Sequence, residues 1–448
     1  MWFTKWCGGL GARPTRLGSN NNTIPHVDGV LSPAKDEFFT ALKMKKTNYV
    51  KIAIYVILAI VVIGFFRNTL GRGMNDFDVV HRAATRVLHT ENLYNFEDGH
   101  YLYKYSPFFA LLVAPIGLLP LSYASLVWLL GMCVSLFFIM KMAKQMIMSD
   151  KPPPAFFYIL SLLLASKFLA REIRLGQTDF LILLFIFICL LFTERGKEFL
   201  AGIFLALSIL IKPTSLVFLP YFLYKKRFRL TATTILISLV FLLAPSLVYG
   251  FSGNINLLLG WKKIMSISSP PLLAVDMNQS IFALFHRLLT STPYGVNILN
   301  LSYTTVTAII YTAIVGLFGF LLFLNKKSET IEKPFVHSKE SIEYSLLFIF
   351  MALFSPLGWF QNYSSSILAI MILVYYVLET NFSKIPPKAG KDKFITFMLV
   401  LFFILVDIIN FETVGRRLND LSLYLSFITW GILILIACLS KLRLSRIA

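Results

Sequence analysis

Long apolar runs, separated by short polar segments, make up most of the chain after residue 48. A run of about 18 or more mainly apolar residues is typical of a helix that spans a bilayer, because a helix satisfies its backbone hydrogen bonds internally. The segment 48–66 is long enough by itself. The pattern therefore predicts an all-α fold, a polytopic transmembrane helical bundle.

The apolar runs predict about twelve spans. They cover 48–66, 121–140, 155–170, 178–193, 199–211, 213–224, 231–249, 303–324, 343–355, 364–379, 394–410 and 421–440. Several are short for a bilayer. The pair that flanks Lys212-Pro213 also fits one kinked or broken helix, because proline removes a helical hydrogen bond.

The segment before the first run is polar and lacks the apolar core of a signal peptide. Two interpretations of 1–43 stay open: a disordered cytoplasmic tail, or a misassigned extension with Met44 as the true start. We expect 44–448 to form a single transmembrane domain.

Lysine and arginine gather in every second connection between the runs, for example at 225–229 and 441–446. The positive-inside rule puts these connections, and both termini, on the cytoplasmic side of the cell (inner) membrane. The connections expected outside are 67–120, 171–177, 250–302, 356–363 and 411–420. Two of them, 67–120 and 250–302, are long enough to carry an extracytoplasmic active site.

The loop 67–120 also contains helical signals. Phe77, Val80, Ala84 and Leu88 recur at helical spacing, so 76–90 is predicted as an amphipathic helix in the membrane interface. Asn75 or Asp76 is the expected N-cap. Residues 107–119 are predicted as a second, short apolar helix.

Composition and charge narrow the function. Of 448 residues, 57% are hydrophobic and 15% are charged, which leaves no room for a large soluble domain. The net charge of +19 serves membrane topology first, so we expect the lipid bilayer as a partner and no nucleic acid. Single cysteines and histidines without ligand spacing predict no disulfide framework, no metal site and no cofactor.

Ionisable residues near a membrane are candidates for function because they are costly there. Asp76 stands where the first outward loop enters its helix, and N-capping and general-base catalysis both fit it. Asp78 is about 200° further around the helix, so both carboxylates cannot face one cavity. An ion-pair face with His81 and Arg82 fits Asp78.

Three cationic residues are candidates for binding a lipid phosphate. Arg171 and Arg174 lie in an outward connection, against the positive-inside trend, and suit a lipid phosphate through their planar donor forks. Ion pairing with Glu172 and Asp179 is the alternative. Lys212 suits a phosphate too, and snorkelling to the interface is its alternative.

An ordered series of motifs resembles a known family. The motifs of this series are, in chain order, Asp76-Phe77-Asp78-Val79, Tyr105-Ser106-Pro107-Phe108-Phe109, Gly176-Gln177-Thr178-Asp179, Ile211-Lys212-Pro213-Thr214, Asn278-Gln279-Ser280 and Ser355-Pro356-Leu357-Gly358-Trp359. In this order they resemble the polyprenol-phosphate-mannose-dependent alpha-mannosyltransferases, glycosyltransferase family 87 of the GT-C superfamily. The resemblance covers roughly residues 48–380, and its specificity lies in the order of the motifs.

The resemblance implies a GT-C type bundle in which a polyprenyl-phosphate sugar donor meets a glycolipid or glycan acceptor in an outward cavity. It maps the catalytic base onto Asp76. Arg171, Arg174 and Lys212 become candidates for the donor phosphate. The expected cavity residues are Asp78, His81, Tyr105, Gln177, Asn278, Gln279, Trp359 and Gln361. The chain departs from its relatives at Val80, often Tyr there, and at Gln361 and Asn362, where relatives often have His.

The sequence thus predicts a membrane glycosyltransferase that moves a sugar, mannose by the resemblance, through inverting displacement. A secondary transporter or flippase of lipid-linked sugars is the alternative, and it would show paired mid-membrane charges and an inverted repeat. A non-catalytic scaffold is the third class, and it would not need an outward carboxylate.

Overall fold

The computed structural model describes residues 63–294, 296–328, 336–382 and 392–444. The chain divides into two units, 1–65 and 66–448. The predicted tail 1–43 lies outside the described residues. So does the predicted span 48–66, apart from its last four residues, which are helical.

All regular secondary structure in the described residues is helical, which confirms the all-α prediction. The longer α-helices are α2 (Asn75–Leu88), α4 (Leu121–Met148), α6 (Ser166–Leu175), α7 (Asp179–Glu194), α8 (Glu198–Ile211), α10 (Phe228–Leu243), α11 (Ser246–Ser268), α13 (Tyr303–Ser328), α14 (Ser341–Leu353), α15 (Ile367–Phe382), α16 (Lys393–Phe403), α17 (Phe411–Tyr424) and α18 (Phe427–Leu444). Shorter helices are α3 (Pro107–Val113), α5 (Phe157–Leu164), α9 (Phe218–Tyr224) and α12 (Ile281–Leu289). The segments η1 (Phe96–Asp98), η2 (Ala114–Leu118), η3 (Pro213–Val217), η4 (Pro270–Leu272), η5 (Phe360–Ser366) and η6 (Ile404–Ile408) are 3₁₀ or π turns.

The predicted count of about twelve spans is not confirmed. Within the described residues, four helices are long and apolar enough to cross a bilayer, or up to seven if three bent pairs each count as one span. The bends are 116° between α6 and α7, 95° between α10 and α11, and 93° between α16 and α17. Apolar runs therefore include short and sharply bent helices, which hydropathy alone does not separate from straight spans.

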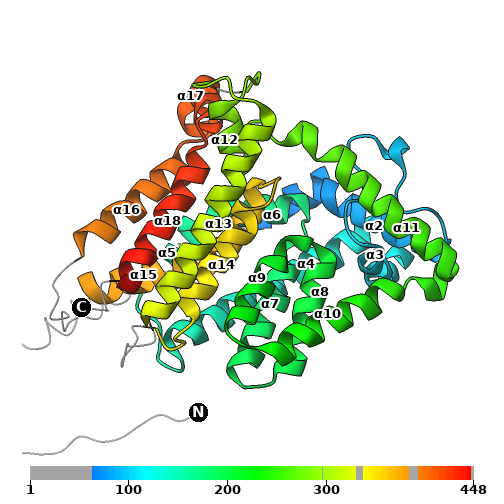
Figure 1. Cartoon of the computed structure of the whole chain (residues 1–448), viewed down its shortest axis with the longest axis horizontal. Helices are drawn as coiled ribbons and strands as arrows, with labels where there is room; N and C mark the ends of the chain where they lie inside the picture. Colours follow the sequence, from blue (N-terminus) through cyan, green and yellow to red (C-terminus); the bar gives the residue numbers. More distant parts are fainter. Residues whose placement is uncertain (1–62, 295, 329–335, 383–391, 445–448) are drawn as a thin grey trace, which may run out of the picture. The chain divides into compact units, whose positions relative to one another are not determined.

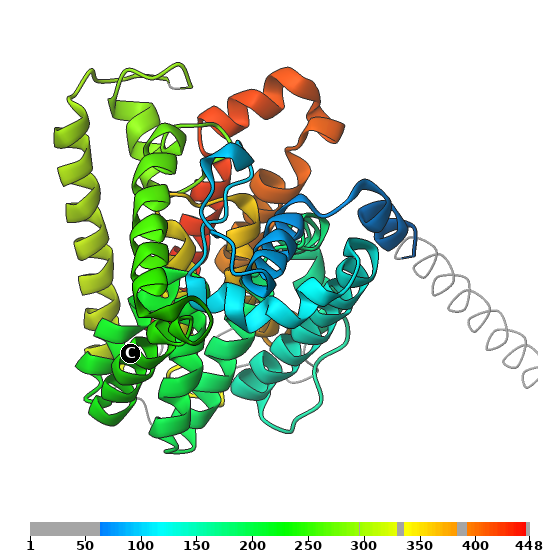
Figure 2. The ribbon, with the colours of Figure 1, turned by 90° about the vertical axis from the view of Figure 1, so that its right-hand side faces the viewer.

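The second unit contains two groups of packed helices (Figure 1). In one, α4, α7, α8 and α10 pack in that order; in the other, α14, α15, α16 and α18 pack together. The two short segments η3 and η5 contact helices of both groups. Helix α13 stands at the edge in the turned view of Figure 2, and only 17% of its most apolar stretch is buried, as expected for a helix that faces lipid.

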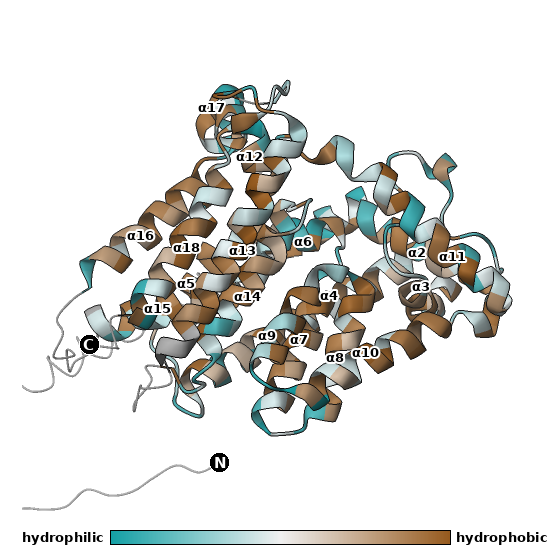
Figure 3. Cartoon of the chain, in the orientation of Figure 1, coloured by the Kyte–Doolittle hydropathy of each residue, from teal (hydrophilic) through white to brown (hydrophobic). Residues whose placement is uncertain are grey.

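Hydrophilic residues concentrate on a few helices and connections. In Figure 3, α6 and the connection that precedes α10 carry hydrophilic positions, whereas α4, α7 and α10 are largely hydrophobic. The predicted amphipathic helix 76–90 forms as α2 over Asn75–Leu88, and the predicted helix 107–119 forms as α3 and η2. The predicted cap of α2 was wrong, because the N-cap position is Met74 and no side chain caps the helix. Much of the expected loop 250–302 is helical as well, in α11 and α12.

Candidate active site

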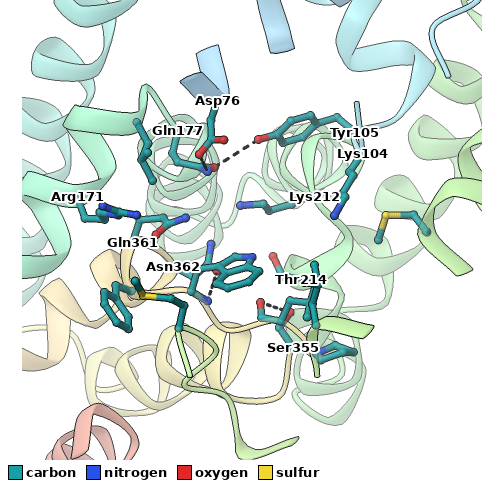
Figure 4. A pocket seen from close by; sticks show the side chains of 18 of the residues that line it. Asp76, Lys104, Tyr105, Arg171, Gln177, Lys212, Thr214, Ser355, Gln361 and Asn362 are labelled. Atoms are coloured by element: carbon teal, nitrogen blue, oxygen red, sulfur yellow. Dashed lines mark hydrogen bonds between the residues drawn. The ribbon is translucent and has the colours of Figure 1, made fainter. Parts of the chain in front are cut away.

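A cavity of about 800 Å³ lies where α2, the turn between α6 and α7, η3 and η5 come together. Its charged and amide-bearing lining consists of Asn75, Asp76, Lys104, Arg171, Gln177, Lys212, Asp276, Gln361 and Asn362 (Figure 4). Apolar residues such as Val217, Met265, Leu272, Phe350 and Phe354 line another part of the wall. The cavity therefore offers both a charged surface and an apolar surface to a ligand.

Asp76 lies in the first turn of α2 and is held by the neighbouring turn. The amide of Gln177 donates a hydrogen bond to Asp76 Oδ2, and Tyr105 Oη donates to Gln177 Oε1 at 3.4 Å. Burial raises the pKa of the Asp76 carboxyl above its usual range, against the lowering effects of the Gln177 bond and of nearby Lys212 and Arg171. A carboxylate with a raised pKa that borders a cavity is suited to accept a proton.

The turn that carries Gln177 is packed closely onto α2. Gly176 has φ +69°, and a Cβ atom there would meet Phe77 Cβ at 2.7 Å and Met74 Cβ at 2.9 Å. Trp128 of α4 donates to the Gly176 carbonyl at 2.9 Å and stacks on Phe77 with ring centroids 5.0 Å apart. Glycine is therefore what lets this turn approach the start of α2 and bring Gln177 to Asp76.

Lys212 has a carboxylate partner from a distant part of the sequence. Its Nζ lies 2.9 Å from Oδ1 of the buried Asp179, and Asn362 Nδ2 donates to the other Asp179 oxygen at 2.7 Å. Glu172 Oε1 accepts from the backbone N–H groups of Asp179 and Phe180, at 2.8 and 3.2 Å, and so caps the start of α7. Lys212 thus points into the cavity as a member of an ion pair.

Arg171 and Arg174 do not pair with the carboxylates that the sequence offered as their alternative partners. Asp179 binds Lys212, Glu172 caps α7, and within the described residues neither guanidinium forms an ion pair or hydrogen bond. Arg171 is half-buried and lines the cavity, whereas Arg174 is exposed and lies outside its lining. Arg171 is therefore available to an anion in the cavity.

Comparison with known proteins places these residues in a family. The model of glycosyltransferase family 87 matches residues 103–332, just over half of the chain. The chain belongs to glycosyltransferase family 87. No curated protein and no solved structure matches it.

Family 87 is a GT-C type family, so membership confirms the resemblance and makes the protein a membrane glycosyltransferase. Nothing in the comparisons supports the transporter alternative. The matched range includes Gln177 and Lys212 but begins after Asp76 and ends before Trp359. The roles of Asp76 and Trp359 therefore depend on the geometry of the cavity rather than on the match.

Not all the residues that the resemblance proposed for this family 87 cavity line it. Tyr105, Gln177, Trp359 and Gln361 do, together with Asp76, Arg171 and Lys212. Asp78, His81, Arg174, Asn278 and Gln279 are not in the lining. No ion pair joins Asp78 to His81 or Arg82 in the described residues; His81 contacts the Leu119 carbonyl, and Arg82 donates to the Tyr101 carbonyl and lies 3.7 Å from Asp98.

The motif Asn278-Gln279-Ser280 holds backbone together. The buried Asn278 amide donates to the Pro356 carbonyl at 2.8 Å and accepts from the Gly358 N–H at 2.9 Å. Gln279 Nε2 donates to the Asp276 carbonyl at 2.7 Å. These bonds fix the Ser-Pro turn that leads to Trp359 on the cavity wall, so the motif shapes the site from outside it.

Among the charged cavity residues of this family 87 chain, sequence reasoning missed Asp276 and also Lys104. Lys104 directly precedes the motif that begins at Tyr105, and only Tyr105 of these two neighbours was proposed for the cavity. A lysine between buried tyrosines in an outward loop is a signal that could have found it, because a cation there is against the positive-inside trend. Among the described residues, no group of three His, Cys, Asp or Glu could hold a metal ion.

Proposed function

We propose that the protein transfers a sugar, mannose by family resemblance, from a polyprenyl-phosphate donor to an extracytoplasmic lipid or glycan acceptor. One observation carries the proposal: the carboxylate of Asp76 borders a cavity that also contains Lys212 and Arg171, and Arg171 forms no ion pair within the described residues. A general base and a phosphate-binding surface in one cavity are what such a transfer requires.

In the proposed mechanism Asp76 accepts the proton of the acceptor hydroxyl. The hydroxyl oxygen forms a bond to the anomeric carbon while the bond from that carbon to the phosphate oxygen breaks, so the configuration inverts. Asp76 ends protonated, and polyprenyl phosphate leaves with one more negative charge than the donor carried. The bond from Gln177 occupies one carboxylate oxygen and orients the group.

The two cations then act on the departing phosphate. Arg171 supplies a planar donor fork, and Lys212 supplies an ammonium group that Asp179 holds in position, with Asp179 in turn bound by Asn362. Charge develops on the phosphate in the transition state, so fixed donors in a partly buried site stabilise it more than water would. The apolar wall formed by residues such as Val217, Phe350 and Phe354 suits the prenyl chain of the donor.

The test compares two aspartates on the same helix. Radiolabelled sugar transfer from polyprenyl-phosphate mannose to membrane acceptors is measured for purified wild type, Asp76→Asn and Asp78→Asn. We expect the rate of transfer to fall at least about 100-fold in Asp76→Asn, which is the effect typical of losing a general base. In Asp78→Asn the rate should change by less than about twofold, because this side chain is outside the cavity lining.

Equal transfer by Asp76→Asn and wild type would remove Asp76 from the mechanism. Similar losses in both variants, with folded protein in each, would show that the charge of this helix matters rather than the position of one carboxylate. Transfer from a nucleotide sugar in place of the lipid-linked donor would contradict the donor class.

A further inference from the structure

Helices α10 and α11 meet in a sharp bend, at the right of the view in Figure 1. Their axes differ by 95°, so only one of the two can run along the membrane normal. Helix α10 follows the basic segment 225–229, which the charge pattern places on the cytoplasmic side. Helix α10 therefore leads across the membrane, and α11 continues along the outward surface.

An apolar stripe lies on the exposed side of α11. Phe251, Ile255 and Leu259 are spaced four residues apart, so their side chains lie on one face of the helix. All three are exposed, Phe251 to 68% and Leu259 to 59%. At the bend, between this stripe and the exposed apolar side chains of α10, Leu247 is 89% exposed. An exposed apolar surface that continues from a spanning helix is expected to contact lipid.

Two lysines follow the stripe. Lys262 lies three residues after Leu259 on the same face, and Lys263 lies beside it. Both are exposed, and α11 contains no acidic residue. Within the described residues neither ammonium group forms an ion pair, and that of Lys263 lies 5.4 Å from the centre of the Phe96 ring. A stripe that ends in lysines matches the acyl chains and the anionic headgroups of a membrane surface.

Another side of α11 holds the loop that lines the cavity. Trp261 donates to the Lys104 carbonyl at 2.9 Å, and Tyr249 Oη donates to the Glu91 carbonyl at 2.9 Å. Lys104 is itself part of the cavity lining. Contact between the stripe and the bilayer would therefore fix the depth of this loop, and of the cavity wall that it forms, relative to the membrane.

We propose that α11 lies in the outward membrane interface, with the apolar stripe among the acyl chains and with Lys262 and Lys263 bound to anionic phospholipid headgroups. Each ammonium group donates hydrogen bonds to phosphate oxygens of the headgroups. None of the stripe residues and neither lysine lines the cavity, so lipid binding at α11 is independent of the proposed transfer.

The test measures which lipids surround the stripe. In a background without the native cysteines, Leu259→Cys is labelled with a bimane fluorophore and reconstituted in nanodiscs of phosphatidylcholine and phosphatidylglycerol. Two preparations have the same lipid composition and differ only in which lipid carries a nitroxide quencher on its acyl chain, at the same mole fraction. The ratio of quenching by labelled phosphatidylglycerol to quenching by labelled phosphatidylcholine reports the local enrichment of anionic lipid.

We expect both lipids to quench the fluorophore at position 259. The quenching ratio should be about two or more, because each lysine near an anionic surface contributes about a fivefold preference. The ratio should fall to about one in Lys262→Gln/Lys263→Gln. It should also fall to about one at about 1 M salt, where the Debye length is about 3 Å.

Two controls match the position and the charge. Val315→Cys carries the fluorophore on the exposed face of α13, which should be quenched equally by the two lipids. Arg416→Gln/Arg417→Gln removes two exposed cations from α17, another helix predicted outside, and should leave the ratio at position 259 unchanged.

A ratio of about one at position 259 with the native lysines would overturn the proposal, and so would a ratio that persists in Lys262→Gln/Lys263→Gln. The same enrichment at position 315, or its loss in the α17 variant, would assign it to the whole disc or to net charge and would also overturn it. Weak quenching by both lipids at position 259 would show that protein or water covers the stripe. Lipid quenching requires no sugar transfer, so these outcomes are distinct from failure of the proposed reaction.

Discussion

At the scale of single residues, the pKa of the Asp76 carboxyl group is set by effects of opposite sign. Burial raises its pKa, while the Gln177 amide, Lys212 and Arg171 lower it. Removing the amide in Gln177→Leu should therefore raise the pKa of Asp76 further, because the hydrogen bond that favours its charged form is lost. The base works when it is deprotonated, so activity is lost as pH falls through this pKa, and the loss should begin at a higher pH in the variant.

This prediction is checked on the acid limb of kcat/KM against pH. Gln361→Leu is the control, because Gln361 also lines the cavity but forms no hydrogen bond with Asp76. The acid limb of Gln361→Leu should coincide with that of wild type, whatever its rate. Identical limbs in all three proteins would mean that Asp76 does not set the acid limb or that its bond with Gln177 is not formed in solution.

Single residues also show what sequence can and cannot locate. Asp76 and Gln177 were proposed for the cavity from motif order, and both line it. The partner of Lys212 was not found, because Asp179 is 33 positions away and only the fold brings the two together. For Asn278 the sequence identified the residue but not its role, since a buried amide that holds backbone and one that touches substrate have the same sequence signal.

At the scale of elements, the turn between α6 and α7 positions the base from a separate helix. Gly176→Ala would place a methyl group against Phe77 and Met74 in a backbone conformation with φ +69°. We expect α2 to be displaced from the turn and the Asp76–Gln177 hydrogen bond to be lost. The rate of transfer should then fall at least about tenfold, which corresponds to the free energy of one charge-assisted hydrogen bond.

A second glycine isolates the steric effect. Gly196 has φ +71°, and a Cβ atom there would meet nothing within 4 Å, so Gly196→Ala has only the cost of a left-handed alanine, about 1 to 2 kcal/mol. Both variants should lower the melting temperature in detergent, but only Gly176→Ala should lower the specific activity of the protein that remains folded. Equal specific activities would show that the close approach to α2 is not needed for function.

Elements differ in how far hydropathy predicts them. The amphipathic helix α2 was predicted from its period because its apolar face packs on the unit while its other face stays more polar. The break at Ala165 was not predicted, because it lies inside one continuous apolar run, 155–170. The bends before α7 and α17 fall at the predicted connections 171–177 and 411–420, but the polar helices α6 and α17 beside these bends were not predicted. The number of spans therefore could not be obtained from hydropathy.

At the scale of the whole molecule, the remaining question is which side of the membrane the cavity faces. Basic residues in alternate connections predict that the loop with Glu97 is outside and the connection with Arg195 is inside. Both positions are exposed in the described residues, so single cysteines there can react with a maleimide reagent. In a background without the native cysteines, Glu97→Cys should be labelled by a membrane-impermeant maleimide in intact cells, and Arg195→Cys only after permeabilisation. Lipid-linked sugars would then reach Asp76 from the extracytoplasmic leaflet, whereas the reverse labelling would require a donor and an acceptor on the cytoplasmic side and would contradict the proposed location of the reaction.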